Sequence, residues 1–312
     1  MAVDPLVPLQ ARPEHEAMKA ELEATGDYLV LSRLTETTEY APANAEAKYV
    51  AVYLDTETTG LEVGRDRIIE LAMVAFEYDL AGNVYRLLRT SSQLEDPGRP
   101  LAAEIVQLTG LTDDDLAGTA IDDSQVASFL DQARLVVAHN AAFDRPFVEK
   151  RLPHFAKLPW ACSIADVGWR ELGFSSSAMD YLAFKHGFFF SGHRALVDSL
   201  AGVRILASSN NGTGRPAMAR LRENALKNSV RLWAENSPFD SKDALRERRY
   251  RWNPEARSWW TEVPEEQHEA ELEWLATAVY GRRVALPYFR VTAQERYSLR
   301  VPTTIPADAK RL

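Results

Sequence analysis

Two short apolar segments, each followed at once by an acidic motif, constrain the fold of this chain more than any other feature. Residues 49–54 (YVAVYL) and 134–139 (RLVVAH) are largely apolar runs. Such runs are typical of strands buried on both faces of a sheet. Residues 67–78 and 84–90 predict two further strands around a turn at Ala81-Gly82-Asn83.

Helices are predicted between and after these strands. Apolar residues recur at helical spacing in segments 122–133, 141–152, 178–186 and 194–207. Strands in a meander, followed by strands that alternate with helices, predict an α/β architecture in which helices flank a mixed sheet.

Polar segments without a period divide the chain into five parts. Residues 1–48 are predicted to form an N-terminal extension that contains a helix at 14–25, a strand at 28–34 and a linker at 35–48. We expect the remaining parts to be a main domain at 49–207, a flexible linker at 208–216, a small α+β domain at 217–300 and a tail at 301–312.

The overall charge by itself argues against a nucleic-acid partner. The chain carries 36 Lys and Arg against 45 Asp and Glu, a formal net charge of −9, whereas binding to phosphates needs cations. The acidic excess is confined to residues 1–216, because residues 217–312 hold 17 Lys and Arg against 14 Asp and Glu. An acidic body joined to a mildly basic segment is compatible with nucleic acid.

Other bulk features indicate a cytoplasmic protein without a membrane anchor. No apolar run reaches the roughly eighteen residues of a membrane span, and the first residues lack the basic start and apolar core of a secretory signal. The single cysteine, Cys162, allows neither an internal disulfide nor a thiolate zinc cluster.

The first acidic motif, Asp55-Thr56-Glu57-Thr58-Thr59-Gly60, directly follows the first buried strand. Two carboxylates two residues apart at a strand end point to the same side, which suits a hard cation. Gly60 lets a substrate backbone approach closely. A surface turn explains the same residues equally well, so this motif alone is evenly balanced between the two roles.

The second motif, His139-Asn140-Ala141-Ala142-Phe143-Asp144, follows the second buried strand. Asp144 falls on the first turn of a helix, where an acidic side chain often only complements the helix dipole. His139 is predicted to be a hydrogen-bonded structural histidine rather than a catalytic one.

The third motif is His193-Arg194-Ala195-Leu196-Val197-Asp198. Its two ends cannot share a helical face, because five residues turn a helix by roughly 500°. We therefore expect His193 on a loop at the entry of the helix and Asp198 inside the helix, pointing inward. By itself, a histidine beside a glycine is usually an exposed bystander.

Together and in this order, the three motifs resemble those of the DEDDh exonuclease family, which includes the proofreading subunit of bacterial DNA polymerase III and ribonuclease T. The family motifs Asp-x-Glu-Thr-Thr-Gly, His-Asn-x-x-Phe-Asp, and His followed five residues later by Asp are matched by residues 55–60, 139–144 and 193–198. Residues 68–72 (IIELA) and 108–112 (LTGLT) resemble further family landmarks. The resemblance spans the predicted main domain and implies a ribonuclease H-like fold.

The resemblance implies a metal-dependent 3′→5′ exonuclease. Two divalent cations about 3.5–4 Å apart would activate a water and stabilise the leaving oxygen. Four carboxylates favour Mg²⁺ or Mn²⁺ over zinc. The expected metal ligands are Asp55, as the bridging ligand, Glu57, Asp144 and Asp198. His193 is expected to be the general base, because histidine ordinarily titrates near neutral pH.

The resemblance also implies which residues contact the substrate. Leu54, Thr58, Thr59 and Leu61 are expected around the 3′-terminal nucleotide, with Asn140 as a further contact. The expected partner is nucleic acid, as single strands or frayed 3′ ends, with DNA favoured over RNA.

The segment 217–300 holds a second candidate site. A helix at 241–249 and a hairpin that turns at 253–256 are predicted, and the aromatic residues nearby could simply fill a small core. Alternatively, four arginines and a Trp form a basic face that binds single strands. These arginines are Arg246, Arg248, Arg249 and Arg251.

This segment also resembles the HARP module of annealing helicases, which implies nucleic-acid binding. Lys242 and Arg249 are then the first candidates for phosphate contacts.

Two other functions stay open. An exoribonuclease that trims RNA would use the same residues, because recognition of the 2′-hydroxyl has no linear signature. A catalytically inactive nucleic-acid-binding module agrees less well, since a pure binder gains nothing from four clustered carboxylates. The sequence therefore favours a 3′→5′ exonuclease that releases nucleoside 5′-monophosphates from DNA.

Overall fold

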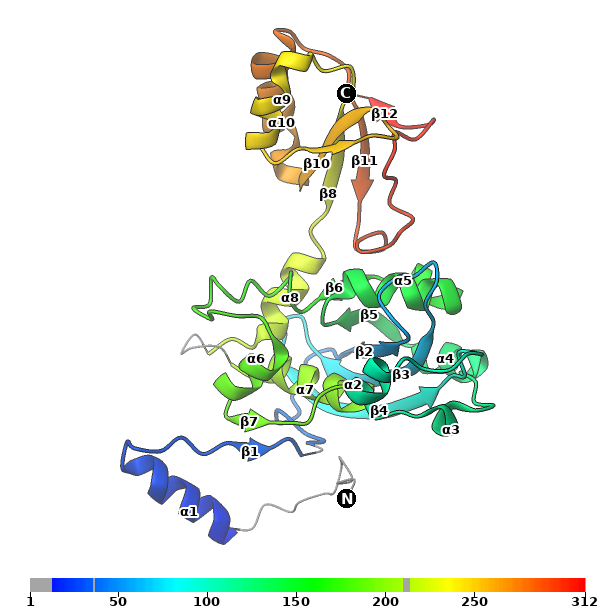
Figure 1. Cartoon of the computed structure of the whole chain (residues 1–312). Helices are drawn as coiled ribbons and strands as arrows, with labels where there is room; N and C mark the ends of the chain where they lie inside the picture. Colours follow the sequence, from blue (N-terminus) through cyan, green and yellow to red (C-terminus); the bar gives the residue numbers. More distant parts are fainter. Residues whose placement is uncertain (1–12, 36, 210–213, 312) are drawn as a thin grey trace. The chain divides into compact units, whose positions relative to one another are not determined.

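The chain folds into two compact units that divide between Asn224 and Ala225 (Figure 1). The computed structural model describes residues 13–35, 37–209 and 214–311. Residues 210–213 of the predicted linker lie outside the described residues. The division falls beyond that linker, so nearly all of helix α8 (Ala217–Ala225) belongs to the first unit.

The first unit is built on a five-stranded mixed sheet with the strand order β4-β3-β2-β5-β6 (Figure 1). Its strands are β2 (Tyr49–Thr58), β3 (Ile68–Tyr78), β4 (Val84–Leu94), β5 (Ala133–Ala138) and β6 (Trp160–Cys162). Strand β3 is antiparallel to β2 and β4, whereas β5 runs parallel to β2 and β6. The predicted α/β architecture, a mixed sheet flanked by helices, is confirmed, and strand β6 was not predicted.

Helices follow the strands much as the apolar spacing predicts. They are α2 (Ala103–Thr109), α3 (Asp113–Leu116), α4 (Asp123–Leu130), α5 (Ala141–Arg151), the 3₁₀ helix η1 (Pro153–Lys157), α6 (Met179–Lys185) and α7 (Ala195–Ala207). Helix α4 ends earlier than predicted, because Ala133 already opens β5.

The N-terminal extension is tied to the first unit. Helix α1 (Pro13–Ala24) forms as predicted, but the predicted strand at 28–34 is reduced to β1 (Ser32–Arg33). This short strand pairs in parallel with β7 (Phe188–Phe189). The segment predicted as a linker forms a bridge between Glu39 and Arg86 of β4.

Helix α7 lies unusually close to strand β2. It packs on β2, β3 and β4. A Cβ atom placed on Gly202 would lie 2.1 Å from the ring of the fully buried Tyr53, a distance that real Cβ atoms do not reach. Only glycine therefore permits this approach. Asp198 lies one helical turn before Gly202, so the same contact brings Asp198 toward the end of β2.

The C-terminal unit is a five-stranded antiparallel sheet packed against helices, with the strand order β12-β11-β8-β10-β9. The strands are β8 (Ser229–Ala234), β9 (Arg251–Asn253), β10 (Ser258–Pro264), β11 (Pro287–Val291) and β12 (Lys310–Arg311). The helices are η2 (Phe239–Ser241), α9 (Lys242–Glu247), η3 (Glu265–Gln267), α10 (His268–Trp274) and the π-helical η4 (Leu275–Tyr280).

The predicted helix and hairpin of this unit are present, but three of its strands were not predicted. Strand β12 lies in the stretch 301–312, which the sequence assigned to a tail. Tyr250 is buried in the core and Trp259 packs against it, as the core-filling alternative predicts, whereas half of Trp252 is exposed.

No helix in the described part of the chain is long and apolar enough to span a membrane. The cytoplasmic location stays a prediction.

Gly202→Ala tests the close packing of α7 on β2. The new methyl group must displace the Tyr53 ring, so we expect the free energy of unfolding to fall by about 1–3 kcal/mol, against the gain that Ala normally brings inside a helix. Chemical unfolding measures the change. Gly64→Ala is the matched control, because a Cβ there meets nothing within 4 Å. Equal stability of the two variants would contradict the packing argument.

Candidate active site

Three of the four predicted metal ligands meet at the end of strand β2. Asp55 and Glu57 belong to β2, and Asp198 comes from the first turn of α7. One carboxylate oxygen from each lies within 4.8 Å of the others, and all three side chains are half-buried. In the described residues, no other set of His, Cys, Asp or Glu gathers in this way.

Asp144, the fourth predicted ligand, reaches the cluster from the other side of the sheet. Side chains alternate along a strand, so Tyr53, Asp55 and Glu57 face α7, while Thr56 faces the opposite layer. There the Thr56 hydroxyl donates a hydrogen bond of 2.8 Å to Oδ1 of Asp144, on the first turn of α5. Asp144 is nearly fully buried and lies outside the group of three.

The cluster holds its protons more tightly than isolated carboxyl groups do. Burial, reinforced by the charge of Asp144, raises the pKa of Asp55 well above its ordinary value. Burial and the charge of Asp198 raise the pKa of Glu57 to about 8. Burial also raises the pKa of Asp144 to about 7 and that of Asp198 to about 6. A divalent cation would lower these pKa values, because its positive charge stabilises the ionised carboxylates.

The donor set fits such a cation. Oxygen atoms of carboxylates are the ligands that Mg²⁺ and Mn²⁺ prefer, and the three half-buried side chains still have exposed surface. Asp55, Glu57 and Asp198 are therefore the residues that could hold a metal ion here, with Asp144 beside Asp55.

His193 lies on a loop at the entry of α7, as predicted. Its φ of 67° is left-handed, which is uncommon for a residue with a side chain, and the imidazole is exposed. The helix begins two residues later, and the backbone amide of Arg194 donates a hydrogen bond of 3.1 Å to Oδ2 of Asp198. The Asp198 carboxylate thus fixes the backbone of the loop that carries His193.

Glu70 is a part of the site that was recognised in the sequence only as a family landmark. It is fully buried and lies opposite Glu57 in the β2–β3 ladder. Its carboxylate accepts hydrogen bonds from Nε of Arg194 at 3.2 Å, from the amide of Ala195 at 3.3 Å and from Ser92 at 2.9 Å. Glu70 therefore fixes the start of α7. Only the pairing register of two strands, which a sequence does not display, would have revealed it.

His139 has the structural role that its sequence position predicts. Its Nδ1 lies 2.6 Å from Oγ of Ser163, which in turn lies 3.2 Å from the hydroxyl of Tyr53. Burial lowers the pKa of His139 to about 4, so the ring is neutral near pH 7. Through Ser163, the ring is linked to Tyr53 of β2.

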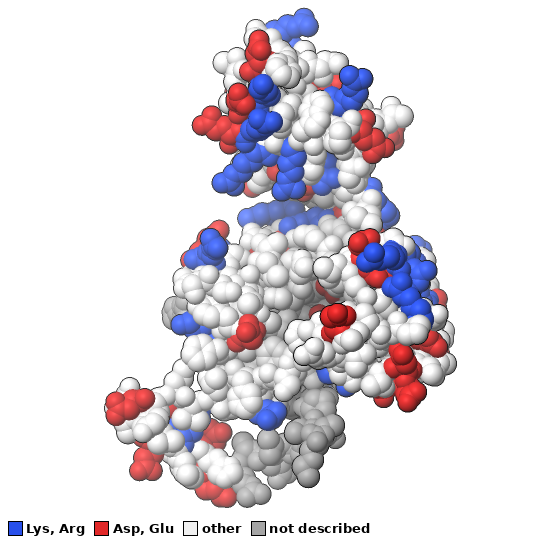
Figure 2. Space-filling model, in the orientation of Figure 1, with Lys and Arg blue, Asp and Glu red and all other residues white. Residues whose placement is uncertain are grey.

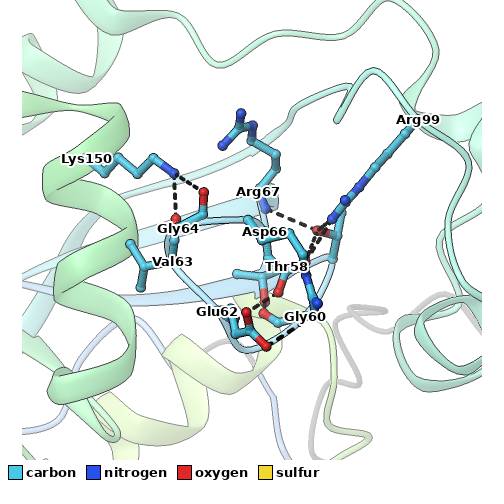
Figure 3. A network of polar contacts seen from close by, with 11 residues as sticks. Thr58, Gly60, Glu62, Val63, Gly64, Asp66, Arg67, Arg99 and Lys150 are labelled. Carbon is cyan, nitrogen blue, oxygen red and sulfur yellow. Dashed lines mark hydrogen bonds and ion pairs between the residues drawn. The ribbon is translucent and has the colours of Figure 1, made fainter.

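The loop between β2 and β3 is held from two sides (Figure 3). The buried carboxylate of Asp66 accepts hydrogen bonds from the amide of Glu62 at 2.9 Å, from the hydroxyl of Thr59 at 3.2 Å and from Nη2 of Arg99 at 2.8 Å. On the other side, Lys150 of α5 donates to the carbonyl groups of Val63 and Gly64. These contacts fix the loop that follows the first motif.

The remaining predicted substrate contacts differ in exposure. Leu61, on the loop just described, is 81% exposed, and Asn140 is exposed in the left-handed conformation before α5. Leu54 is fully buried, so its side chain offers no surface to a nucleotide. Thr58 is buried, and Thr59 uses both its amide and its hydroxyl inside the loop.

The two predicted phosphate contacts of the C-terminal unit lie apart from these residues in the sequence. Lys242 opens α9, and its ammonium lies 4.2 Å from the centre of the Phe239 ring. Arg249 follows α9 with a left-handed φ of 66° and is exposed.

The sheet topology and the acidic cluster define the first unit as an exonuclease domain of the DEDD type. Residues 52–206 match the family model RNase_T, described as "Exonuclease", so this part of the chain is a domain of that family. The match ends at residue 206, and the likeness of the C-terminal unit to HARP modules stays a prediction.

Relatives in sequence match about a third of this chain. The DNA polymerase III PolC-type protein of Listeria innocua is 38% identical over 96 residues, which are 30% of this chain but 6% of the relative. The corresponding protein of Bacillus subtilis is 37% identical over 99 residues, 31% of this chain and 6% of that protein. The chain thus corresponds to a small fraction of these relatives.

Among solved structures, exonuclease X in complex with 5′ overhanging duplex DNA is similar to this chain. It is 22% identical, with a TM-score of 0.42, over 55% of this chain and 98% of the exonuclease.

Asp55→Asn tests the electrostatic state of the metal-free cluster. Because the folded pKa values lie above the unfolded value of about 4, the stabilising protonated form is lost as the pH rises through about 6 to 8. In chelator, removing one charge should therefore raise the midpoint of thermal unfolding by roughly 2–4 °C at pH 8. The same substitution should change the midpoint little at pH 5.

The exposed Asp114→Asn serves as the control for this experiment, because Asp114 lies on helix α3 and is not one of the clustered carboxylates. Addition of Mg²⁺ should stabilise the unchanged protein more than the Asp55→Asn variant. The same pH dependence for Asp55→Asn and for the unchanged protein would refute the argument.

Asp66→Ala tests the contacts that hold the loop after β2. Removing the buried acceptor leaves the amide of Glu62 and the guanidinium of Arg99 without it, so we expect the free energy of unfolding to fall by about 1–3 kcal/mol. Amide hydrogen exchange in residues 60–66 should also become faster. Glu62→Ala removes an exposed acidic side chain from the same loop and should do neither. An equal response of both variants would exclude the proposed role of Asp66.

Proposed function

We propose that this protein is a metal-dependent 3′→5′ exonuclease that releases nucleoside 5′-monophosphates from DNA. The observation that carries the proposal is the convergence of carboxylate oxygens of Asp55, Glu57 and Asp198 within 4.8 Å. Asp144 accepts a hydrogen bond from Thr56, the residue between Asp55 and Glu57 in the sequence. The family assignment of residues 52–206 supports the same chemistry.

Asp55, Glu57, Asp144 and Asp198 would hold two divalent cations, Mg²⁺ or Mn²⁺. When bound, such cations lower the pKa of water and stabilise charge on the leaving oxygen of an in-line displacement. The protein's own contribution is a fixed set of oxygen donors: β2 positions Asp55 and Glu57, and the packing at Gly202 positions Asp198.

His193 would accept the proton of the attacking water. Its exposed ring lies on the loop before α7. The hydrogen bond that the amide of Arg194 donates to Asp198 positions both this base and the expected metal ligand. The Glu70–Arg194 ion pair fixes the other side of this loop. Glu70 acts in this way as a positioning residue.

The exposed side chains beside the cluster would bind the 3′-terminal nucleotide. Leu61 offers an apolar surface on a fixed loop, and Asn140 offers an exposed amide at the start of α5. Thr58 and Thr59 would contribute through the backbone of the same loop, since their hydroxyl groups donate within it. The side chain of Leu54 has no part in this surface.

DNA is the favoured substrate because the relatives in sequence are DNA polymerases by name. The 3′→5′ direction rests on the three motifs that resemble the DEDDh family, namely residues 55–60, 139–144 and 193–198.

Single substitutions in the site test the mechanism. Asp198→Asn should abolish hydrolysis, because it removes a charged ligand. His193→Gln should lower the rate about 10²–10⁴-fold, the usual contribution of a general base. The assay uses 5′-labelled single-stranded DNA, duplex DNA and RNA with Mg²⁺, Mn²⁺ or chelator. Stepwise shortening from the 3′ end that stops in chelator is the expected result.

Asp114→Asn and His154→Gln are matched controls that change exposed residues outside the site and should keep full activity. Substantial hydrolysis by Asp198→Asn, or shortening that continues in chelator, would overturn the metal mechanism. Faster shortening of RNA than of DNA would show that RNA is the preferred substrate, and the metal mechanism would still hold.

A further inference from the structure

The C-terminal unit contains a hollow lined by arginines that the exonuclease chemistry does not use. Its volume is about 500 Å³, within the range of ordinary ligand sites. We name it the arginine groove and define it by its four arginines and one aromatic residue: Arg231, Arg248, Arg249, Arg251 and Trp260. Figure 2 shows Lys and Arg side chains grouped on the surface of this unit.

Strand pairing brings these residues together. Strand β10 lies between β8 and β9, and Trp260 pairs directly with Arg251 of β9. Two residues further along β10, Glu262 pairs with Arg231 of β8. Residues two apart on a strand share a face, so Arg231, Arg251 and Trp260 lie on one surface of the sheet.

Two of the arginines are held in place by carboxylates. Nη2 of Arg231 lies 2.9 Å from Glu262, and its buried Nε has no hydrogen-bond partner among the described residues. Arg248 forms three contacts of 3.0–3.1 Å with the buried Glu271. These pairs fix the guanidinium groups and neutralise about half of the positive charge of the groove.

The other two arginines keep their charge. Arg249 and Arg251 are exposed, and neither forms an ion pair within the described ranges of the chain. The guanidinium groups of Arg231 and Arg251 lie 4.5 and 5.4 Å from the centre of the Trp260 ring. The groove thus combines an excess of about two positive charges with a half-buried aromatic surface.

We propose that the arginine groove binds the sugar–phosphate backbone of single-stranded DNA, and so gives the exonuclease a second contact with its substrate; this rests on the proposed function. All the cations of the groove are arginines, whose planar forks match phosphate oxygens in bidentate fashion. Aromatic and guanidinium planes are also the surfaces on which unpaired bases stack. A strand of phosphates and bases uses both features, whereas an acidic peptide uses only the charge.

The experiment measures binding of the full chain to 5′-fluorescein-labelled dT₃₀ by fluorescence anisotropy, in chelator, over a range of salt concentrations. The double variant Arg249→Gln, Arg251→Gln removes the two unpaired charges and keeps the side-chain volume. Each phosphate contact on a single strand contributes about −0.7 to the slope of log K against log salt concentration. Loss of two contacts should therefore make the slope shallower by about 1.4. Binding should weaken accordingly.

The matched control is Arg257→Gln, Arg282→Gln, which removes two charges without an ion pair among the described residues from exposed positions of the same unit outside the groove. It should leave both affinity and slope unchanged. An unchanged slope in the groove variant, or the same loss in the control, would overturn the proposal. Thermal unfolding of both variants checks that the fold is kept.

A poly-glutamate peptide with the same number of charges tests the other kind of partner. We expect it to bind more weakly than dT₃₀. Tight binding of the peptide that is lost in the groove variant, while dT₃₀ binding is retained, would assign the groove to an acidic protein partner and overturn the proposal. Because hydrolysis plays no part in chelator, an inactive nuclease that still binds dT₃₀ through the groove would refute only the proposed function.

Discussion

Repulsion among clustered carboxylates is the constraint on which the rest of the exonuclease unit depends. Two unit charges 4 Å apart repel each other by about 4 kcal/mol in a protein environment with an effective dielectric constant near 20. Oxygens of Asp55, Glu57 and Asp198 lie within 4.8 Å of one another. The fold must therefore bring these groups together against their mutual repulsion. Burial is the main reason why the pKa values of Asp55 and Glu57 are raised, and the charges of the neighbouring carboxylates add to it.

Packing and hydrogen bonding hold the carboxylates together against their mutual repulsion. The β2–β3 ladder holds Asp55 and Glu57 in place, and the contact between Gly202 and Tyr53 holds α7 against β2. Glu70 adds a further negative charge, but it also brings in the guanidinium of Arg194, which lowers the pKa of Glu57. The same ion pair fixes the start of α7, so Arg194, which reduces the repulsion, also helps to position His193 and Asp198.

Features set by local sequence could be predicted, and features set by long-range pairing could not. The strands before Asp55 and His139 were visible as apolar runs, and the loop position of His193 followed from the geometry of a helix. The role of Glu70 depends on its register opposite Glu57, and strands β8 and β11 pair across more than fifty residues of chain. Exposure was equally hidden: the strand that presents Asp55 buries Leu54 completely, because alternate side chains face opposite layers.

The charge distribution of the chain follows from the same constraint. A site that gathers carboxylates repels phosphates unless bound cations cancel its charge, and even a loaded site attracts a strand only within roughly one Debye length, about 8 Å at physiological salt. Attraction for the rest of a strand has to come from cations placed elsewhere. In the arginine groove, Glu262 and Glu271 fix two guanidinium groups, while Arg249 and Arg251 stay free to meet phosphates. The net charge of −9 is therefore a poor guide to nucleic-acid binding, since a strand responds to the charges within a Debye length of it and not to their sum over the chain.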